Sequence, residues 1–219
     1  PGWSIVRRCG KGSSRVNHGV KRSPNIASSA NAPSFKQQTN QAINTALMEG
    51  ASLMSDTNPV PCAPLSCPTI EVISEWIDYN GHMNMAYYNV AFDRYGTDYL
   101  LDQLGLGIDY VQRENASTFT LEQHVSYLRE LRIGDPIHMT CQLLDYDSKR
   151  VHCFLNMYHA KEDYLAATSE QILMHVDLDR RRGSPLPDVA LKKLAAMNKS
   201  HGQLPRPPQA GHVIAIRRG

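Results

Sequence analysis

The chain has 219 residues, of which 42% are hydrophobic and 20% are charged, and its formal net charge is +2. This length and composition suit one ordinary globular domain with an additional segment. No apolar run approaches the ~18 residues that a membrane-spanning helix needs, so we predict that the protein has no membrane partner. Five cysteines without a CxxC pair favour reduced thiols and a cytoplasmic location.

The positive charge is concentrated at the beginning of the chain. Residues 1–47 contain seven basic residues and no acidic one, so the rest of the chain has a formal charge of −5. An acidic body argues against nucleic acid as a partner. We predict that residues 1–60 form a disordered basic head or a non-native extension, residues 61–200 the folded domain and residues 201–219 a flexible tail. The composition of the head also fits an organellar transit segment, with Met48 or Met54 as candidate starts of the protein.

The first predicted elements are a strand and a long helix. Residues 69–78 are β-branched and roughly alternating, which predicts a strand that ends at Asp78. Asn80 and Gly81 then predict a turn. From Asn84 onward, apolar and aromatic residues recur every three or four positions, which predicts an amphipathic helix of about five turns. It should end near residues 104–107, where Gly105 can adopt the left-handed conformation.

The remaining pattern is that of an antiparallel sheet. After the helix we expect only strands, at residues 117–128, 136–145, 150–159 and 164–178, and then a short terminal helix within 186–201. One large helix lying across such a sheet makes an α+β fold with two layers. The other face of the sheet and the edge of the strand 117–128 need cover, which favours a dimer.

Polar residues cluster where the first strand meets the long helix. The N-terminus of a helix presents unpaired backbone N–H groups, so it can hold a carbonyl oxygen on which negative charge develops. Asp78, a few residues away, can attack that carbonyl or activate a water molecule, with His82 and Asn84 orienting the reactants. The alternative is that Asp78 and Asn84 only stabilise a turn and a helix N-terminus, and that His82 is incidental.

These residues also carry a resemblance to a known family. The joint formed by Asp78, Gly81, His82, Asn84 and Tyr88, with the segment LRIGDPI at 131–137, resembles the hotdog-fold acyl-CoA thioesterases of the 4-hydroxybenzoyl-CoA thioesterase-like group. The resemblance covers about residues 69–178. It implies a hotdog fold, an antiparallel sheet wrapped around one long central helix, and hydrolysis of an acyl-CoA thioester. Asp78 would be the nucleophile or general base, and a backbone N–H near Met85 the oxyanion donor.

The resemblance also implies a substrate and its contacts. The segments TLEQHVSYLRELRIGD and ATSEQILMHVDL are most similar to betainyl-CoA thioesterases of bacterial carnitine catabolism. Active sites between subunits would let Glu122 and His124 reach the partner's site. Arg129 and Arg132 are candidates to meet the phosphates of CoA, as are the basic residues Lys149, Arg150, Arg180, Arg181 and Arg182.

Aromatic rings around the joint favour a particular acyl group. Tyr79, Tyr88 and several neighbouring rings could surround a quaternary ammonium group by cation–π attraction, so betainyl-CoA is the favoured substrate. The alternatives are that the rings only pack the helix against the sheet, that the basic side chains merely face solvent, and that Glu122 and His124 are simply polar surface residues.

Two other functions stay open. One is an enoyl-CoA hydratase or dehydratase of the same fold, against which the short separation of Asp78 and His82 argues. The other is a non-catalytic acyl-CoA sensor, against which the presence of Asp78 argues. We expect no metal, because the histidines form no HxxxH or HxH pair joined to an acid. We also expect no separate cofactor, since CoA would be part of the substrate.

Overall fold

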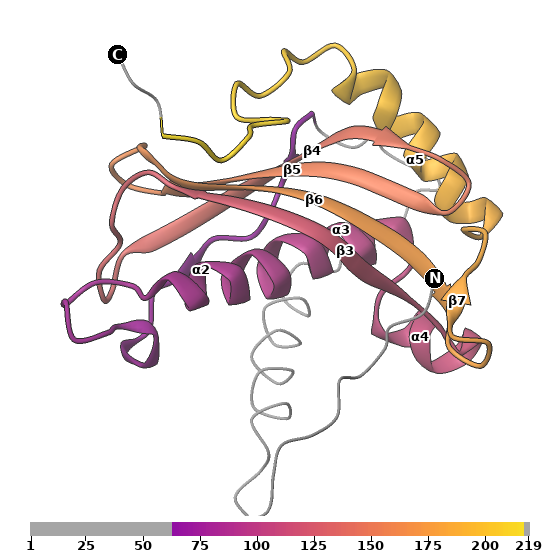
Figure 1. Cartoon of the computed structure of the whole chain (residues 1–219), viewed down its shortest axis with the longest axis horizontal. Coiled ribbons are helices and arrows are strands. Elements are labelled where there is room, and N and C mark those ends of the chain that lie inside the picture. The colour runs from indigo at the N-terminus through magenta and orange to yellow at the C-terminus, as the bar shows by residue number, and fades with distance from the viewer. Residues whose placement is uncertain (1–62, 217–219) are drawn as a thin grey trace, which may run out of the picture. The chain divides into compact units, whose positions relative to one another are not determined.

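The computed structural model of the chain describes residues 63–216 (Figure 1). The predicted head at residues 1–60 lies outside the described residues, and the division of the chain into head, domain and tail stays a prediction. No helix within the described part is long and apolar enough to cross a membrane. The same part contains no group of three or more His, Cys, Asp or Glu residues that could hold a metal ion.

The predicted long helix is confirmed. It consists of α2 (Met85–Ala91), the π-helical segment η2 (Phe92–Thr97) and α3 (Asp98–Leu104), which follow one another without a break in helical backbone geometry. Gly105 ends it with φ of 80°, as the sequence predicts. The wider turn of η2 brings both Gly96 and Thr97 into buried positions. A Cβ atom at Gly96 would lie 2.4 Å from Leu155 Cδ2, so glycine permits the close approach of helix and sheet.

The predicted sheet is also confirmed. Its long strands are β3 (Ala116–Tyr127), β4 (Pro136–Tyr146), β5 (Arg150–His159) and β6 (Leu165–Asp177). Short strands β1 (Leu65–Ser66) and β2 (Ile70–Glu71) pair with β4, and β7 (Arg182–Gly183) pairs with β6. All pairs are antiparallel, and the strand order β1-β4-β5-β6-β3 leaves β3 at one edge.

The core lies between the sheet and the long helix. The sheet curves over the helix (Figure 1), and alternate residues of β4 and β5, among them Met139, Leu155 and Met157, are fully buried on this side. Ala91 and Phe92 are the corresponding buried residues of the helix. The apolar residues that alternate along the strands and those that recur at helical spacing over residues 84–104 therefore form two apolar surfaces, which pack against each other as one core.

Two local predictions are wrong. The expected strand over 69–78 is regular only at β2, and a 3₁₀ turn, η1 (Ser74–Trp76), replaces its second half. Val72 and Trp76 are both buried, and the chain between them forms a helical turn rather than a continuous strand. The prediction of strands alone after the long helix missed α4 (Ile108–Glu114), which has no fully buried residue and no side-chain N-cap and therefore leaves little signal in the sequence.

The predicted terminal helix is α5 (Asp188–His201). It packs beside β4, where the buried Nδ1 atom of His201 accepts a hydrogen bond from the amide of Leu143 at 2.8 Å. The chain then returns across the sheet face opposite the long helix (Figure 1). There Gln142 Nε2 donates to the carbonyl of Pro205 at 3.3 Å and the amide of Gly211 donates to Glu170 Oε2 at 2.6 Å. Part of the face that needed cover is thus covered by the chain itself.

Candidate active site

A closed loop carries Asp78 to the beginning of α2. The Asp78 amide donates to the carbonyl of His82 at 3.1 Å, and the Gly81 amide donates to the carbonyl of Asp78 at 3.0 Å. Gly81 has φ of 80°, which side chains other than glycine rarely adopt. The Asn84 amide donates to the carbonyl of Trp76 at 2.9 Å. The loop therefore returns on itself and places Asp78 next to the first turn of the helix.

Asn84 joins the carboxylate of Asp78 to the helix. Its Oδ1 atom accepts a hydrogen bond from the Ala86 amide at 2.9 Å, so Asn84 is the N-cap of α2. Its Nδ2 atom donates to Asp78 Oδ2 at 3.1 Å, and Asp78 Oδ1 accepts from the amide of Asn80 at 2.8 Å. The Asn84 side chain thus accepts a hydrogen bond from a helix N–H group and also donates one to the carboxylate. A capping role for Asn84 and an orienting role are therefore compatible.

The first turn of α2 presents an available donor beside this carboxylate. The amide of Met85 has no acceptor among residues 63–216, and the Met85 side chain is exposed. Its carbonyl oxygen is held by Asn89 Nδ2 at 3.2 Å and by the Tyr127 hydroxyl at 3.3 Å. Sequence reasoning missed Asn89 and Tyr127, because their contact depends on how β3 is placed against the helix.

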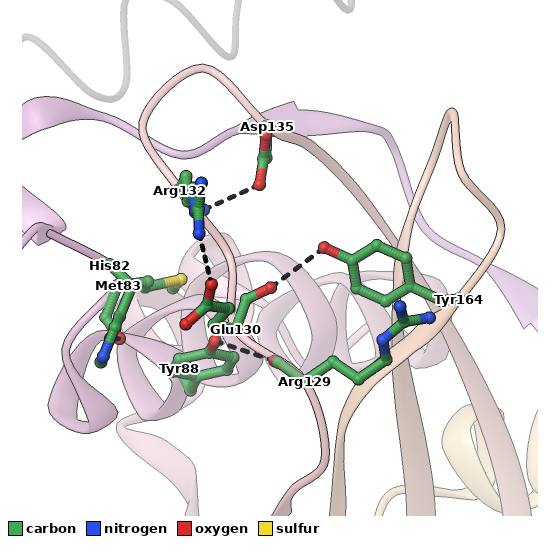
Figure 2. A network of polar contacts seen from close by, with 8 residues as sticks. All are labelled: His82, Met83, Tyr88, Arg129, Glu130, Arg132, Asp135 and Tyr164. Atoms are coloured by element: carbon green, nitrogen blue, oxygen red, sulfur yellow. Dashed lines mark hydrogen bonds and ion pairs between the residues drawn. The ribbon is translucent and has the colours of Figure 1, made fainter.

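His82 does not join Asp78. Its Nδ1 atom lies 3.4 Å from the carbonyl oxygen of Met83, and no contact between the imidazole and the Asp78 carboxylate is found in the described part of the chain. Figure 2 shows His82 beside Met83, near the loop after β3 that carries Glu130. The structure therefore brings Asp78, Asn84 and Met85 together, and an orienting role for His82 stays a prediction.

The aromatic residues of the joint divide into separate environments. Tyr88 is buried, its hydroxyl donates to the carbonyl of Arg129 at 3.3 Å, and its ring meets Tyr127 edge-on at 5.4 Å. Burial raises the pKa of Tyr88 to about 12. Tyr79, in contrast, is 97% exposed. Trp76 packs against Tyr87 and Tyr95. Within one chain, Tyr79 and Tyr88 do not form a common group around Asp78.

Glu122 and His124 lie on the face of β3 that points away from the helix. Side chains alternate along a strand, and Tyr127 contacts the helix, so residues 122 and 124 point the other way. The ring of His124 stacks on His212 of the C-terminal segment, with 5.8 Å between centroids. In their own chain these residues are therefore separated from Asp78 by the sheet, and their contact with a partner's site stays a prediction.

The basic residues proposed for CoA lie at two ends of the sheet. Arg129 and Arg132 are in the loop that follows β3, whose Leu131 carbonyl accepts from the Met83 amide at 2.7 Å, beside the site (Figure 2). Arg150 is the first of the ten residues of β5, and the last residue of this strand lies near the loop after β3. Arg150 is therefore about 30 Å from this loop. The remaining candidates lie at that far end too, at Lys149 and at Arg180, Arg181 and Arg182.

The sequence is similar to those of known proteins. The profile of the family described as the Thioesterase-like superfamily matches residues 72–194. A Pseudomonas aeruginosa protein named betainyl-CoA thioesterase is 37% identical over 145 residues, which are 66% of this chain and 91% of that protein. A Rhizobium sp. protein named L-carnitine dehydrogenase/betainyl-CoA thioesterase is 36% identical over 155 residues, which are 71% of this chain and only 31% of that protein.

A solved structure supports the same assignment. A Staphylococcus aureus protein in complex with CoA has 32% sequence identity and a TM-score of 0.66, and the match covers 76% of this chain and 100% of that one. The predicted α+β hotdog fold, with an antiparallel sheet around a long central helix, is confirmed. The chain belongs to the Thioesterase-like superfamily.

Proposed function

We propose that the chain hydrolyses an acyl-CoA thioester at the joint between Asp78 and α2. The observation that carries this proposal is the carboxylate of Asp78, held by Asn84 at 3.1 Å, next to the unengaged amide of Met85 at a helix N-terminus. The Met85 amide would donate to the carbonyl oxygen of the thioester. Such a donor contributes about 3 kcal/mol to the transition state of acyl transfer.

The reaction needs a nucleophile and a leaving group. Asp78 either attacks the thioester carbon, forming a mixed anhydride that water then opens, or takes a proton from a water molecule that attacks the same carbon. In both routes the C–S bond breaks, CoA leaves as a thiolate that takes up a proton, and the acyl group leaves as a free acid. The electrophilic assistance comes from the helix N-terminus.

Betainyl-CoA is the substrate that we propose first. The names of the Pseudomonas aeruginosa and Rhizobium sp. relatives support it. The trimethylammonium group of this acyl chain is a cation that aromatic faces attract, and Tyr79 is exposed beside Asp78 for such a contact. The enclosure would then require rings from a second subunit, because Tyr88 is buried.

We propose that the working form is a homodimer or a homotetramer. Strand β3 is the last in the sheet order, and the exposed apolar residues in it and directly after it include Phe119, Leu121, Tyr127 and Leu128, with 45–52% of each exposed. An exposed apolar edge strand is a template for pairing with another chain. Since Tyr127 also contacts Met85, a partner on this edge would lie beside the site.

Release of free thiol from a panel of CoA thioesters tests the proposal. The panel contains betainyl-CoA, short straight-chain acyl-CoA and aromatic acyl-CoA, and the proteins are the wild-type chain and its Asp78→Asn variant. Asn keeps the volume of the side chain and an oxygen that can accept from Asn84, so we expect turnover to fall by about 10²-fold or more at an almost unchanged melting temperature.

A matched control is Asp93→Asn, which removes an exposed carboxylate from η2 of the same long helix and should leave turnover unchanged. An Asp78→Asn variant of near-normal activity would refute the assignment of Asp78. Preference for another acyl group would keep the chemistry and discard betainyl-CoA. No hydrolysis of any thioester in the panel would refute the proposed function.

A further inference from the structure

A cavity of about 470 Å³ opens next to the candidate active site. It lies between the loop after β3 and the hairpin that joins β5 to β6, and Arg129 and Tyr164 are among its lining residues. The carbonyl of Arg129 accepts a hydrogen bond from the Tyr88 hydroxyl in α2 at 3.3 Å. The backbone of Arg129 therefore connects the cavity with the first turns of the helix, which also carry the Met85 amide.

The guanidinium group of Arg129 lies against a ring, and no ion pair of it is found in the described part of the chain. Its Cζ atom lies 4.1 Å from the centroid of the Tyr164 ring (Figure 2). The Tyr164 ring is packed against His159 at 5.0 Å, and its hydroxyl donates to the carbonyl of Glu130 at 3.0 Å. No ion pair of Arg129 is found within residues 63–216. One side of the guanidinium group faces the ring, which leaves the other side for a ligand.

The other basic group of the cavity is already engaged. Arg132 forms an ion pair with Glu130 at 2.6 Å, and its amide donates to Asp135 Oδ2 at 2.7 Å (Figure 2). The hydrogen bond and the charge of Arg132 hold the pKa of Glu130 below its usual value. Arg132 is thus no free phosphate ligand, although the sequence makes it equivalent to Arg129.

The balance of charge in the cavity disfavours a phosphate group. Its lining contains the carboxylates of Glu130, Asp135 and Glu162 against the guanidinium groups of Arg129 and Arg132. A phosphate placed there would lie near three carboxylates and only two guanidinium groups, one of which is already paired with Glu130. A flat, neutral ring with hydrogen-bond donors fits better, because it can stack on a guanidinium plane while carboxylates accept its N–H groups.

We propose that this cavity binds the adenine ring of the substrate's CoA, stacked on Arg129 above Tyr164. The exocyclic amine of adenine donates to a carboxylate of the cavity, Glu162 or Glu130, and the phosphates lie outside the cavity. The proposal rests on the proposed acyl-CoA substrate. It makes Arg129 and Tyr164 binding residues with no part in the bond-breaking step.

Truncated substrates test this assignment. The thioester that the wild-type chain hydrolyses would be compared as the CoA, 3′-dephospho-CoA and pantetheine derivatives, and as the CoA derivative with hypoxanthine in place of adenine. The proteins are the wild-type chain, Arg129→Met and, as a control, Arg113→Met. Arg113 is an exposed arginine of α4, which precedes β3, whereas Arg129 follows the other end of that strand. Methionine keeps an unbranched apolar side chain without the guanidinium group, and the Arg129 carbonyl still accepts from Tyr88.

We expect Arg129→Met to raise KM for the CoA derivative by about fivefold or more, and to leave kcat and the KM of the pantetheine derivative unchanged. The wild type should bind the dephospho derivative as well as CoA and the hypoxanthine derivative less well. An equal loss with CoA and pantetheine derivatives would overturn the proposal, since it would place Arg129 in the fold or the reaction. A KM penalty for removing the 3′-phosphate that vanishes in Arg129→Met would also overturn it.

The proposal and the proposed function can fail separately. If the wild type hydrolyses no thioester, the proposed function fails, and calorimetric titration with free CoA, pantetheine and the hypoxanthine analogue of CoA then decides about the cavity. Weaker binding of the hypoxanthine analogue than of CoA, abolished by Arg129→Met, would support an adenine site. Equal binding of all three compounds, or no binding, would refute it.

Discussion

Asn84 offers the sharpest test of the site, because one of its two side-chain contacts can be removed while the other is kept. Its Oδ1 atom caps α2 through the Ala86 amide at 2.9 Å, and its Nδ2 atom donates to Asp78 at 3.1 Å. Asn84→Ser keeps a side-chain oxygen that caps a helix as well as Asn does, but it has no amide group to reach the carboxylate. Asn84→Ala removes both contacts.

The expected magnitudes differ between the two variants. Loss of an N-cap costs about 1 kcal/mol of stability, which lowers the melting temperature of a domain of this size by about 2–4 °C. A hydrogen bond to a charged group is worth about 1.5–3 kcal/mol, so losing the orientation of Asp78 should reduce kcat by about 10- to 150-fold. We therefore expect both variants to lose activity to a similar extent and Asn84→Ala to lose about 1 kcal/mol more stability than Asn84→Ser.

Thermal unfolding and thiol-release kinetics, measured on the same preparations, separate these effects. Asn89→Ala is a control for stability, since the Asn89 side chain also hydrogen-bonds to the backbone of α2, where its Nδ2 atom donates to the Met85 carbonyl, but no contact with Asp78 is found among residues 63–216. If Asn84→Ser kept full activity, the contact between Asn84 and Asp78 would have no role in catalysis. If its activity fell only in proportion to a loss of folded protein, the residue would be structural alone.

Three further predictions concern the helix and the exposed edge. Gly96→Ala should lower the free energy of unfolding by about 1–2 kcal/mol, measured in urea, because the new Cβ would lie 2.4 Å from Leu155 Cδ2; an unchanged midpoint would contradict the close packing. Desolvation of its carboxyl group raises the pKa of Asp98 from 3.8 to about 6, although the residue still exposes part of its surface to solvent, so its protonated form favours folding below pH 3.8 and this contribution is lost as the pH rises through 6. Asp98→Asn should therefore stabilise the chain at pH 7–8 by about 1 kcal/mol, allowing for solvent exposure, and not at pH 3.5; equal effects at both pH values would refute this. Leu121→Asp, on the exposed edge of β3, should shift the sedimentation coefficient to that of a monomer, whereas an unchanged coefficient would place the subunit contact elsewhere.

Much of the fold could be predicted because its pattern is long and regular. The four long strands and the helix from Met85 to Leu104 repeat one period over at least seven residues each, and their observed ends lie close to the predicted ones. The errors fall on short segments. Strand β2 has two residues and η1 has three, so the burial of Val72 and Trp76 decides the backbone there. Helix α4 has seven residues and none fully buried, and its existence depends on contacts with β3 that a local pattern does not reveal.

The site was predictable to the extent that it is local. Asp78 and Asn84 are six residues apart, and a turn followed by an N-cap brings them together almost independently of the rest of the fold. The contact of Tyr127 with Met85 joins residues 42 positions apart and depends on the register of β3. His82 shows the limit of the local argument, because it lies in the same motif and yet turns toward Met83.

The two groups of arginines show why topology, rather than residue type, decides which charges can serve the site. Arg129 and Arg150 both follow or precede long strands next to turns, and the sequence alone treats them alike. Successive antiparallel strands send consecutive turns to opposite ends of the sheet. The loop after β3 and the β5–β6 hairpin therefore meet beside α2, whereas the β4–β5 hairpin with Arg150 lies about 30 Å away. There Arg150 is paired with Asp147 at 2.6 Å, and that pairing holds the pKa of Asp147 at about 2. Of these two arginines, only Arg129 combines a place near the helix N-terminus with a guanidinium group that forms no ion pair within residues 63–216. A ligand that spans the site and the cavity of one chain therefore lies beside Arg129 and far from Arg150 of the same chain.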